Sequence, residues 1–149
     1  MRGFTFREIM DGTILMSDVE RPFRFDFEVT GPSRWLIGIH WLGKMKGTAT
    51  IDGYVNDSPA EGELETAPVR GWMRYAFSFA GPAGEELRFA GRKRIRLLFT
   101  GWTTLRGKVV DGNGTEIGTA VLYFRREQLK PFFRSMRSSP RPKSAAPER

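Results

Sequence analysis

Three side chains of this sequence could do acid–base chemistry or anchor a polar group: Glu8, Tyr75 and Lys93. Glu8 and Lys93 each share the alternating phase of apolar neighbours in segments predicted to be β-strands, so both charges should point to the apolar side. A buried charge must be paired or neutralised. We therefore expect Glu8 and Lys93 to meet inside the fold, as a structural ion pair or as the polar anchor of a ligand pocket. The alternative is a bulge that turns Lys93 outward.

Most other chemistry is excluded by residues that the sequence lacks. There is no cysteine, which removes disulfides, thiolate nucleophiles and thiolate metal sites. His40 is the single histidine, so a histidine-rich metal site within one chain is excluded and a catalytic triad would depend wholly on it. We expect His40 to be an ordinary helix or loop residue. No phosphate-cradling glycine motif precedes a predicted helix, so we expect no metal and no cofactor.

The elements that must position these residues are predicted from alternation. In residues 22–30, Phe23, Phe25 and Phe27 share one face, while charged and polar residues occupy the other, as in a half-buried strand. Gly81-Pro82-Ala83-Gly84 and Asp111-Gly112-Asn113-Gly114 are expected to be hairpin turns. Further turns are predicted at Asp18 to Pro22 and Asp57-Ser58-Pro59. The predicted strands cover 4–17, 22–30, 44–53, 58–66, 71–80, 85–96, 102–110 and 115–125.

Two segments lack this alternation and are predicted to be helical. Residues 33–42 follow Gly31-Pro32, which could start a short helix. In residues 127–137 the apolar side chains recur at helical spacing, and Pro131 would lie in the first turn. The fold class is therefore all-β: an antiparallel, lipocalin-like (calycin-like) barrel of about eight strands with a C-terminal helix.

Length and charge set the domain organisation. The 149 residues suit one domain, which we place at 1–137. The formal charge of +7 belongs to the end of the chain: residues 125–149 hold eight Lys or Arg and two Glu, whereas residues 1–124 hold 16 basic and 15 acidic residues. Residues 138–149, rich in Ser, Pro and positive charge, are predicted to be a disordered tail. The N-terminus has no secretory signal and charges interrupt every apolar stretch, so a cytoplasmic location is expected.

The aromatic residues are expected to gather inside the barrel. Phe25, Phe27, Phe77 and Phe89, together with Tyr75, would line a ligand pocket or simply fill it. Arg88, Arg92, Arg94 and Arg96 fall on the opposite face with few aromatic partners, so no specific nucleic-acid binding is expected. The apolar run containing Trp35, Ile39 and Trp41 could be a core-packed crossover, a lid, or an anchor on a membrane surface, with core packing as the first choice.

The opening Phe6-Arg7-Glu8-Ile9-Met10-Asp11-Gly12 resembles the Phe-x-Glu-x-Met-x-Gly start of a bacterial β domain associated with glucose-methanol-choline (cholesterol-oxidase-like) oxidoreductases and α/β-hydrolases. Gly47-Thr48-Ala49-Thr50, Gly91-Arg92-Lys93 and Trp102-Thr103-Thr104-Leu105 follow in the matching order. The resemblance spans residues 4–137 and implies a lipocalin-like barrel that works beside an enzyme acting on sterols or other lipids. It implies no flavin activity here, because the dinucleotide-binding fingerprint is missing.

Three functional hypotheses follow. The first is a non-catalytic binding or accessory module for a lipophilic small molecule, such as a sterol or fatty acid, with an oxidoreductase or hydrolase as partner. The second is a protein- or membrane-interaction module that uses residues 35–42 and the basic tail, with weak contact to a membrane surface. The third is a small barrel enzyme in which Glu8, Lys93 or Tyr75 acts as acid or base; it ranks last because no nucleophile and base can be paired from the sequence.

Overall fold

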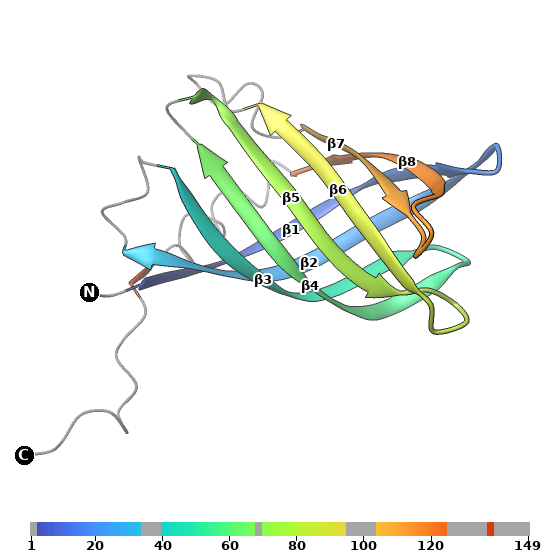
Figure 1. Cartoon of the computed structure of the whole chain (residues 1–149), viewed down its shortest axis with the longest axis horizontal. Helices are drawn as coiled ribbons and strands as arrows, with labels where there is room; N and C mark the ends of the chain where they lie inside the picture. Colours follow the sequence, from blue (N-terminus) through green and yellow to red (C-terminus); the bar gives the residue numbers. More distant parts are fainter. Residues whose placement is uncertain (1–2, 34–39, 68–69, 95–103, 125–136, 139–149) are drawn as a thin grey trace, which may run out of the picture.

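The computed structural model describes residues 3–33, 40–67, 70–94, 104–124 and 137–138. These residues form nine strands and no α-helix (Figure 1). No helix long and apolar enough to cross a membrane occurs in them. The strands are β1 (Gly3–Met16), β2 (Val19–Ser33), β3 (Trp41–Ile51), β4 (Val55–Ala67), β5 (Trp72–Ala80), β6 (Glu86–Arg94), β7 (Thr104–Val110), β8 (Glu116–Tyr123) and β9 (Arg137–Ser138).

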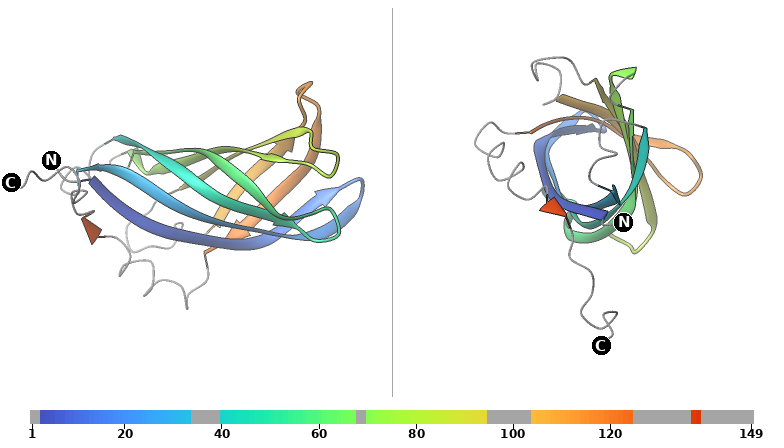
Figure 2. Two further views of the ribbon diagram at one scale, coloured as in Figure 1. Left: turned by 90° about the horizontal axis from the view of Figure 1, so that it is seen from below. Right: turned by 90° about the vertical axis from the view of Figure 1, so that its left-hand side faces the viewer.

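Strands β1 to β8 form a closed, eight-stranded antiparallel barrel. Each strand pairs with the next one in the sequence, and β1 pairs with both β2 and β8, which closes the ring (Figure 2). The β1–β2 ladder runs over almost the full length of both strands, whereas Asp11–Leu15 of β1 pairs with Thr119–Tyr123 of β8. The two-residue strand β9 pairs with Phe4 and Thr5 at the start of β1. Closure leaves β1 to β8 without an open edge at the seam between the first and last of them.

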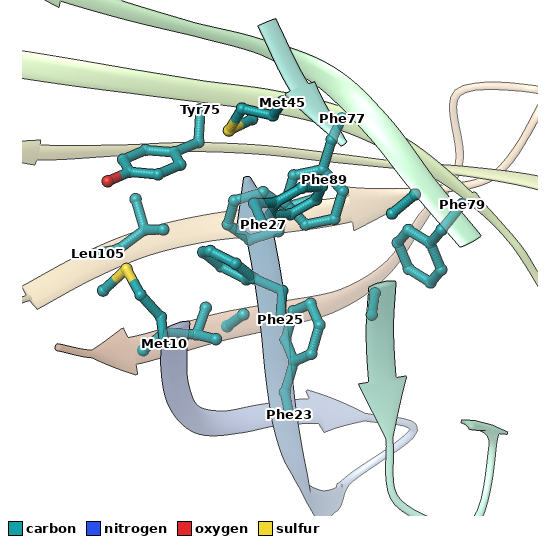
Figure 3. Packing of buried hydrophobic residues seen from close by; sticks show 14 of the residues in the cluster. Met10, Phe23, Phe25, Phe27, Met45, Tyr75, Phe77, Phe79, Phe89 and Leu105 are labelled. Atoms are coloured by element: carbon teal, nitrogen blue, oxygen red, sulfur yellow. The ribbon is translucent and has the colours of Figure 1, made fainter. Parts of the chain in front are cut away.

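Side chains alternate between the barrel interior and its outer surface along every long strand. In β6 the pattern is strict: Leu87, Phe89, Gly91 and Lys93 are buried and the residues between them are exposed. The same period of two gives β2 and β5 their inward phenylalanines. The predicted half-buried strands and the shared aromatic interior are therefore confirmed. The inward residues form one hydrophobic core, part of which is drawn in Figure 3.

Glycines at two inward positions let neighbouring backbones approach closely. A Cβ added to Gly47 would lie 1.9 Å from the carbonyl oxygen of Asp26, and one added to Gly62 would lie 2.0 Å from that of Ala76. Both distances are far below any tolerated contact. These glycines allow the strands to bend tightly enough for the small barrel to close.

Two predicted turns are correct and two are misplaced. The hairpin turns after β5 and β7 lie at Gly81–Gly84 and Asp111–Gly114, as expected. The first turn is Ser17-Asp18 rather than Asp18 to Pro22; both residues have positive φ, 49° and 63°, as a two-residue type I′ hairpin requires. The turn between β3 and β4 lies at residues 52–54, and Asp57-Ser58-Pro59 belongs to β4. Both wrong predictions were based on polar residues and proline, which are common in turns. Such residues can also lie within a strand when the residues on either side of them pair with a neighbouring strand.

The helix predicted at 33–42 is wrong at both ends. Ser33 is the last residue of β2, because the ladder with β1 continues past Gly31-Pro32. Trp41 and Leu42 begin β3 in alternating phase and pair with Thr66 and Glu65 of β4. Residues 34–39 lie outside the described ranges. Most of the predicted C-terminal helix, 127–136, also lies outside them, while Arg137 is a strand residue in β9. Ser138 is paired as well, one residue beyond the proposed domain boundary.

Candidate functional site

The two ends of the barrel differ in how the strands are connected. The turns after β1, β3, β5 and β7 lie at one end, which we call the hairpin end (right in Figure 1). The opposite end carries the start of β1 together with the first residues of β3, β5 and β7, and we call it the N-terminal end. The inward residues nearer the hairpin end differ in chemistry from those nearer the N-terminal end.

The half nearer the hairpin end contains six buried phenylalanines. We call them the aromatic cluster; its members are Phe23, Phe25, Phe27, Phe77, Phe79 and Phe89. Each is at most 3% exposed. Their rings pack on one another, with centroids 4.7 Å apart for Phe27–Phe77 and 4.9 Å for Phe77–Phe89 (Figure 3). The predicted lining residues Phe25, Phe27, Phe77 and Phe89 are thus brought together, and their rings pack against one another.

Glu8, Tyr75 and Lys93 meet on the side of the aromatic cluster that faces the N-terminal end, and we call them the polar trio. The Lys93 ammonium donates to Glu8 Oε2 at 2.9 Å, and the Tyr75 hydroxyl donates to the same oxygen. Glu8 is 1% exposed, Lys93 4% and Tyr75 0%. In Figure 3, Tyr75 lies on the side of the aromatic cluster opposite to Phe79. The predicted meeting of Glu8 and Lys93 inside the barrel is confirmed, and the outward bulge at Lys93 is not present.

The electrostatics of the polar trio follow from burial and pairing. Burial, the negative charge of Glu8 and the hydrogen bond to its carboxylate raise the pKa of the Tyr75 phenol well above its ordinary value of 10.0. Tyr75 therefore stays a neutral hydrogen-bond donor at neutral pH. Lys93 also faces the rings of Tyr75 and Phe124, at 5.2 and 5.8 Å from Nζ to the ring centroids. These cation–π contacts add to the attraction of Glu8 and hold the ammonium in an otherwise apolar interior.

One oxygen of Glu8 remains unused. Glu8 Oε1 is buried and has no hydrogen-bond partner, and within the described ranges the same holds for the Thr66 hydroxyl on β4. Thr66 is 4% exposed and pairs in register with Met73, which in turn pairs with Lys93. Thr66 was not among the predicted site residues, although its inward phase with Leu64 was available as a signal. Buried polar atoms without partners are rare in folded proteins and mark candidate contact points for a ligand or for ordered water.

The residues predicted as a lid or interaction segment are only partly described. Trp35 and Ile39 lie outside the described residues. Trp41 is 7% exposed and belongs to the hydrophobic core, in agreement with core packing, the first choice among its three alternatives. The neighbouring Leu42 points outward and is 55% exposed. His40 is exposed and hydrogen-bonds to Glu65 through Nε2 at 2.7 Å, so it takes part in a surface pair and is remote from the polar trio.

The outer surface carries its own charge pattern. Arg74, Arg92 and Arg106 lie directly opposite one another on β5, β6 and β7, and the guanidinium groups of Arg74 and Arg92 contact the Trp72 ring at 5.7 and 5.1 Å. Arg92 lies on the outer face as predicted, but its contact with Trp72 was not predicted. The hollow lined by Arg24, Asp26, Thr48, Thr50, Asn56 and Asp57, of about 280 Å³, also lies outside the barrel. Within the described part of the chain, no group of three His, Asp or Glu side chains is placed to hold a metal ion.

The candidate site is therefore the buried polar trio with the apolar residues around it. It offers a fixed carboxylate, a buried ammonium and a neutral phenol, which can bind and orient a polar group. Neither models of known protein families nor curated proteins match this chain, so its site is interpreted from its own geometry.

Proposed function

We propose that this protein is a non-catalytic binding or accessory module for a lipophilic small molecule, held in the N-terminal half of the barrel. The observation that carries the proposal is the polar trio, three polar side chains buried between the aromatic cluster and the N-terminal end. Ligand sites are mostly apolar and contain a few convergent polar groups that fix orientation, and this half of the barrel has that composition. The aromatic cluster would form the floor of the site.

Entry of a ligand would require side chains to move. Phe6, Trp41, Met73 and Phe124 are inward residues of the N-terminal half, and each is less than 10% exposed. Their displacement would create the space that a ligand then fills, so the apolar area buried by the ligand must exceed the packing lost by these side chains. Methionine suits such a position because its unbranched side chain repacks readily.

The lipocalin-like character and the partner enzyme are parts of the same proposal. A closed eight-stranded barrel is wide enough to hold one small ligand, which is how lipocalins use the fold. The motif that begins at Phe6 and includes Glu8 supports a role beside a lipid-modifying oxidoreductase or hydrolase. We rank the enzyme hypothesis below binding, because the Lys93 ammonium and the Tyr75 hydroxyl both donate to one oxygen of Glu8. In this arrangement the lysine is held as a charged ion-pair partner, and no neighbouring base among the described residues is placed to activate it as a nucleophile.

The test is ligand retention by the purified protein. Native mass spectrometry and solvent extraction should find a co-purified lipophilic molecule, and a panel of sterols, fatty alcohols and fatty acids should contain compounds that raise the melting temperature. Tyr75→Phe should weaken that shift, whereas Tyr123→Phe, on the outer face of β8 and 50% exposed, should leave it unchanged. Absence of any bound molecule together with absence of any shift across the panel would refute binding.

A second function is supported by the outer surface at the N-terminal end. Leu42 is exposed there, the opposed arginines lie on β5 to β7, and the sequence ends in the basic residues 138–149. These features favour weak contact with an anionic membrane or protein surface. Sedimentation with anionic vesicles should fall at high salt and after removal of residues 139–149, a truncation that keeps β9. Equal sedimentation of the truncated and full chains would exclude a role for the tail.

A further inference from the structure

The two oxygens of the Glu8 carboxylate are used unequally. Oε2 accepts hydrogen bonds from both Tyr75 and Lys93, whereas Oε1 accepts none from any residue that the structure describes, although it is fully buried. A buried acceptor without a donor loses its hydration and gains nothing in return. The unmet requirement at this position is therefore a hydrogen-bond donor.

The charge around Glu8 is already balanced. The carboxylate and the Lys93 ammonium form a close, buried pair with one charge of each sign, and Tyr75 is neutral. Among the described residues, no other ion pair lies in the interior, since the remaining pairs have partners on the outer face. An ionised ligand group entering here would leave one uncompensated charge away from water, which is strongly unfavourable. A neutral group would not.

From these two observations we propose that the ligand is a neutral lipophilic molecule with a hydroxyl group, whose O–H donates to Glu8 Oε1. This inference rests on the proposed binding function and narrows its ligand class. A fatty-acid carboxylate would place an acceptor and a second negative charge against Oε1, so an alcohol is preferred over the acid of the same length. A ketone or ether of that length lacks the donor and is disfavoured for that reason alone.

The first experiment compares straight-chain compounds of equal carbon number with the wild-type protein at neutral pH. An alcohol, a carboxylic acid, a methyl ketone and an alkane compete against a fluorescent apolar probe. The alcohol should bind about tenfold more tightly than the ketone, the difference of one net hydrogen bond to a charged group. If no compound displaces the probe and none changes the melting temperature, the proposed binding function itself fails. If the compounds bind but the acid or the ketone equals the alcohol, binding stands and the hydroxyl inference is overturned.

The second experiment reverses the chemistry of the unused position. In Glu8→Gln, the amide oxygen can keep the Oε2 position and accept from Tyr75 and Lys93, which places the amide N–H₂ where Oε1 was. The atom facing the ligand is then a donor, and the oxygens of an alcohol and of a ketone can both accept from it, so the tenfold preference for the alcohol should be lost. Glu63→Gln, on the exposed outer face of β4, is the matched control and should retain the wild-type order. Unchanged preference in a folded Glu8→Gln protein would overturn the proposal.

A third variant separates loss of selectivity from loss of folding. Glu8→Gln leaves the Lys93 ammonium without a counter-charge, and this can unfold the chain. Glu8→Gln combined with Lys93→Met removes both charges and keeps the donor at the unused position. This double variant should show the same loss of preference, and a tenfold preference for the alcohol retained in it would contradict the inference.

Discussion

The Glu8 carboxylate and the Lys93 ammonium meet at 2.9 Å inside the barrel, although 85 residues separate them in the chain. Their strands, β1 and β6, are not neighbours in the sheet, so the ion pair links two separate parts of the barrel wall through its interior. The pair thus depends on barrel closure as well as on local strand formation. Its energetics can be measured by removing the partners singly and together.

Removal of one partner should destabilise the fold far more than removal of both. Lys93→Met leaves the Glu8 carboxylate buried without a counter-charge, and we expect a loss of about 3–5 kcal/mol in the free energy of unfolding. Glu8→Leu combined with Lys93→Met should recover much of this loss. Denaturant titration measures the free energy of unfolding of the wild type, of Lys93→Met and of the double variant. Lys108→Met, which removes a surface pair with Glu116 at 3.3 Å, is the control and should change stability little. Equal effects of Lys93→Met and Lys108→Met would mean that the buried pair has no special weight.

The phenol of Tyr75 should not ionise while the protein is folded. Its pKa is raised well above 10.0 by burial and by Glu8. In an alkaline titration followed by phenolate absorbance, Tyr75, one of three tyrosines in the chain, should therefore contribute nothing before the protein unfolds. Tyr75→Phe should leave the absorbance change before unfolding unaltered. A smaller pre-unfolding change in Tyr75→Phe than in the wild type would disprove this prediction.

The same shift predicts how stability depends on pH. The folded state holds the Tyr75 proton more tightly than the unfolded chain does. The contribution of this protonated phenol to the free energy of unfolding is therefore fully present below about pH 10 and is lost as pH rises above that value. The wild type should lose stability more steeply than Tyr75→Phe in this range, measured as denaturation midpoints at a series of alkaline pH values. Parallel slopes for the two proteins would show that Tyr75 contributes nothing to alkaline destabilisation.

Two leucines test the orientation of neighbouring strands. Leu64 on β4 is fully buried and Leu42 on β3 is 55% exposed. Leu64→Ala should cost about 2–5 kcal/mol through lost burial and the remaining cavity, whereas Leu42→Ala should have a small effect. Thermal and denaturant unfolding compare the two. Similar losses would place both leucines in similar surroundings and contradict the register of the β3–β4 ladder.

The close backbone approaches at glycine predict a third stability difference. Gly47→Ala and Gly62→Ala each force a methyl group into a neighbouring carbonyl oxygen, so the ladder must shift, with an expected loss of about 1–3 kcal/mol or more. Gly112→Ala is the control, because no atom lies within 4 Å of its added Cβ. If all three variants unfold at the same temperature, the tight approach is not needed for closure.

Much of the barrel could be predicted from the sequence because its strands alternate over most of their length. The phase of Phe23, Phe25 and Phe27 fixed the interior face of β2, and the same reasoning placed Glu8 and Lys93 inside. Alternation reports which face a residue occupies and is independent of distant contacts. For this reason the pair could be anticipated although its members are far apart in the chain.

The errors arose where long-range pairing outweighs local preference. Gly31-Pro32 suggested a break, but the ladder with β1 carries β2 through to Ser33. Ser17 has no intrinsic preference for positive φ, so the two-residue turn it forms with Asp18 could not be read from residue type. Which oxygen of Glu8 is used depends on side-chain geometry across the barrel, and no sequence pattern contains that information.

The order of the strands has a consequence for how the chain folds. From β1 to β8 each hairpin joins neighbours in the sequence, so seven ladders close over short loops and can form early. The ladder between Asp11–Leu15 and Thr119–Tyr123 must instead bring together the two ends of the chain, and it should form last. Tyr75 and Lys93 lie on adjacent strands and can come together before that step, whereas Glu8 reaches them only when the ring closes. Assembly of the trio would then report completion of folding, and an unfinished barrel would lack the site at which we propose that a ligand binds.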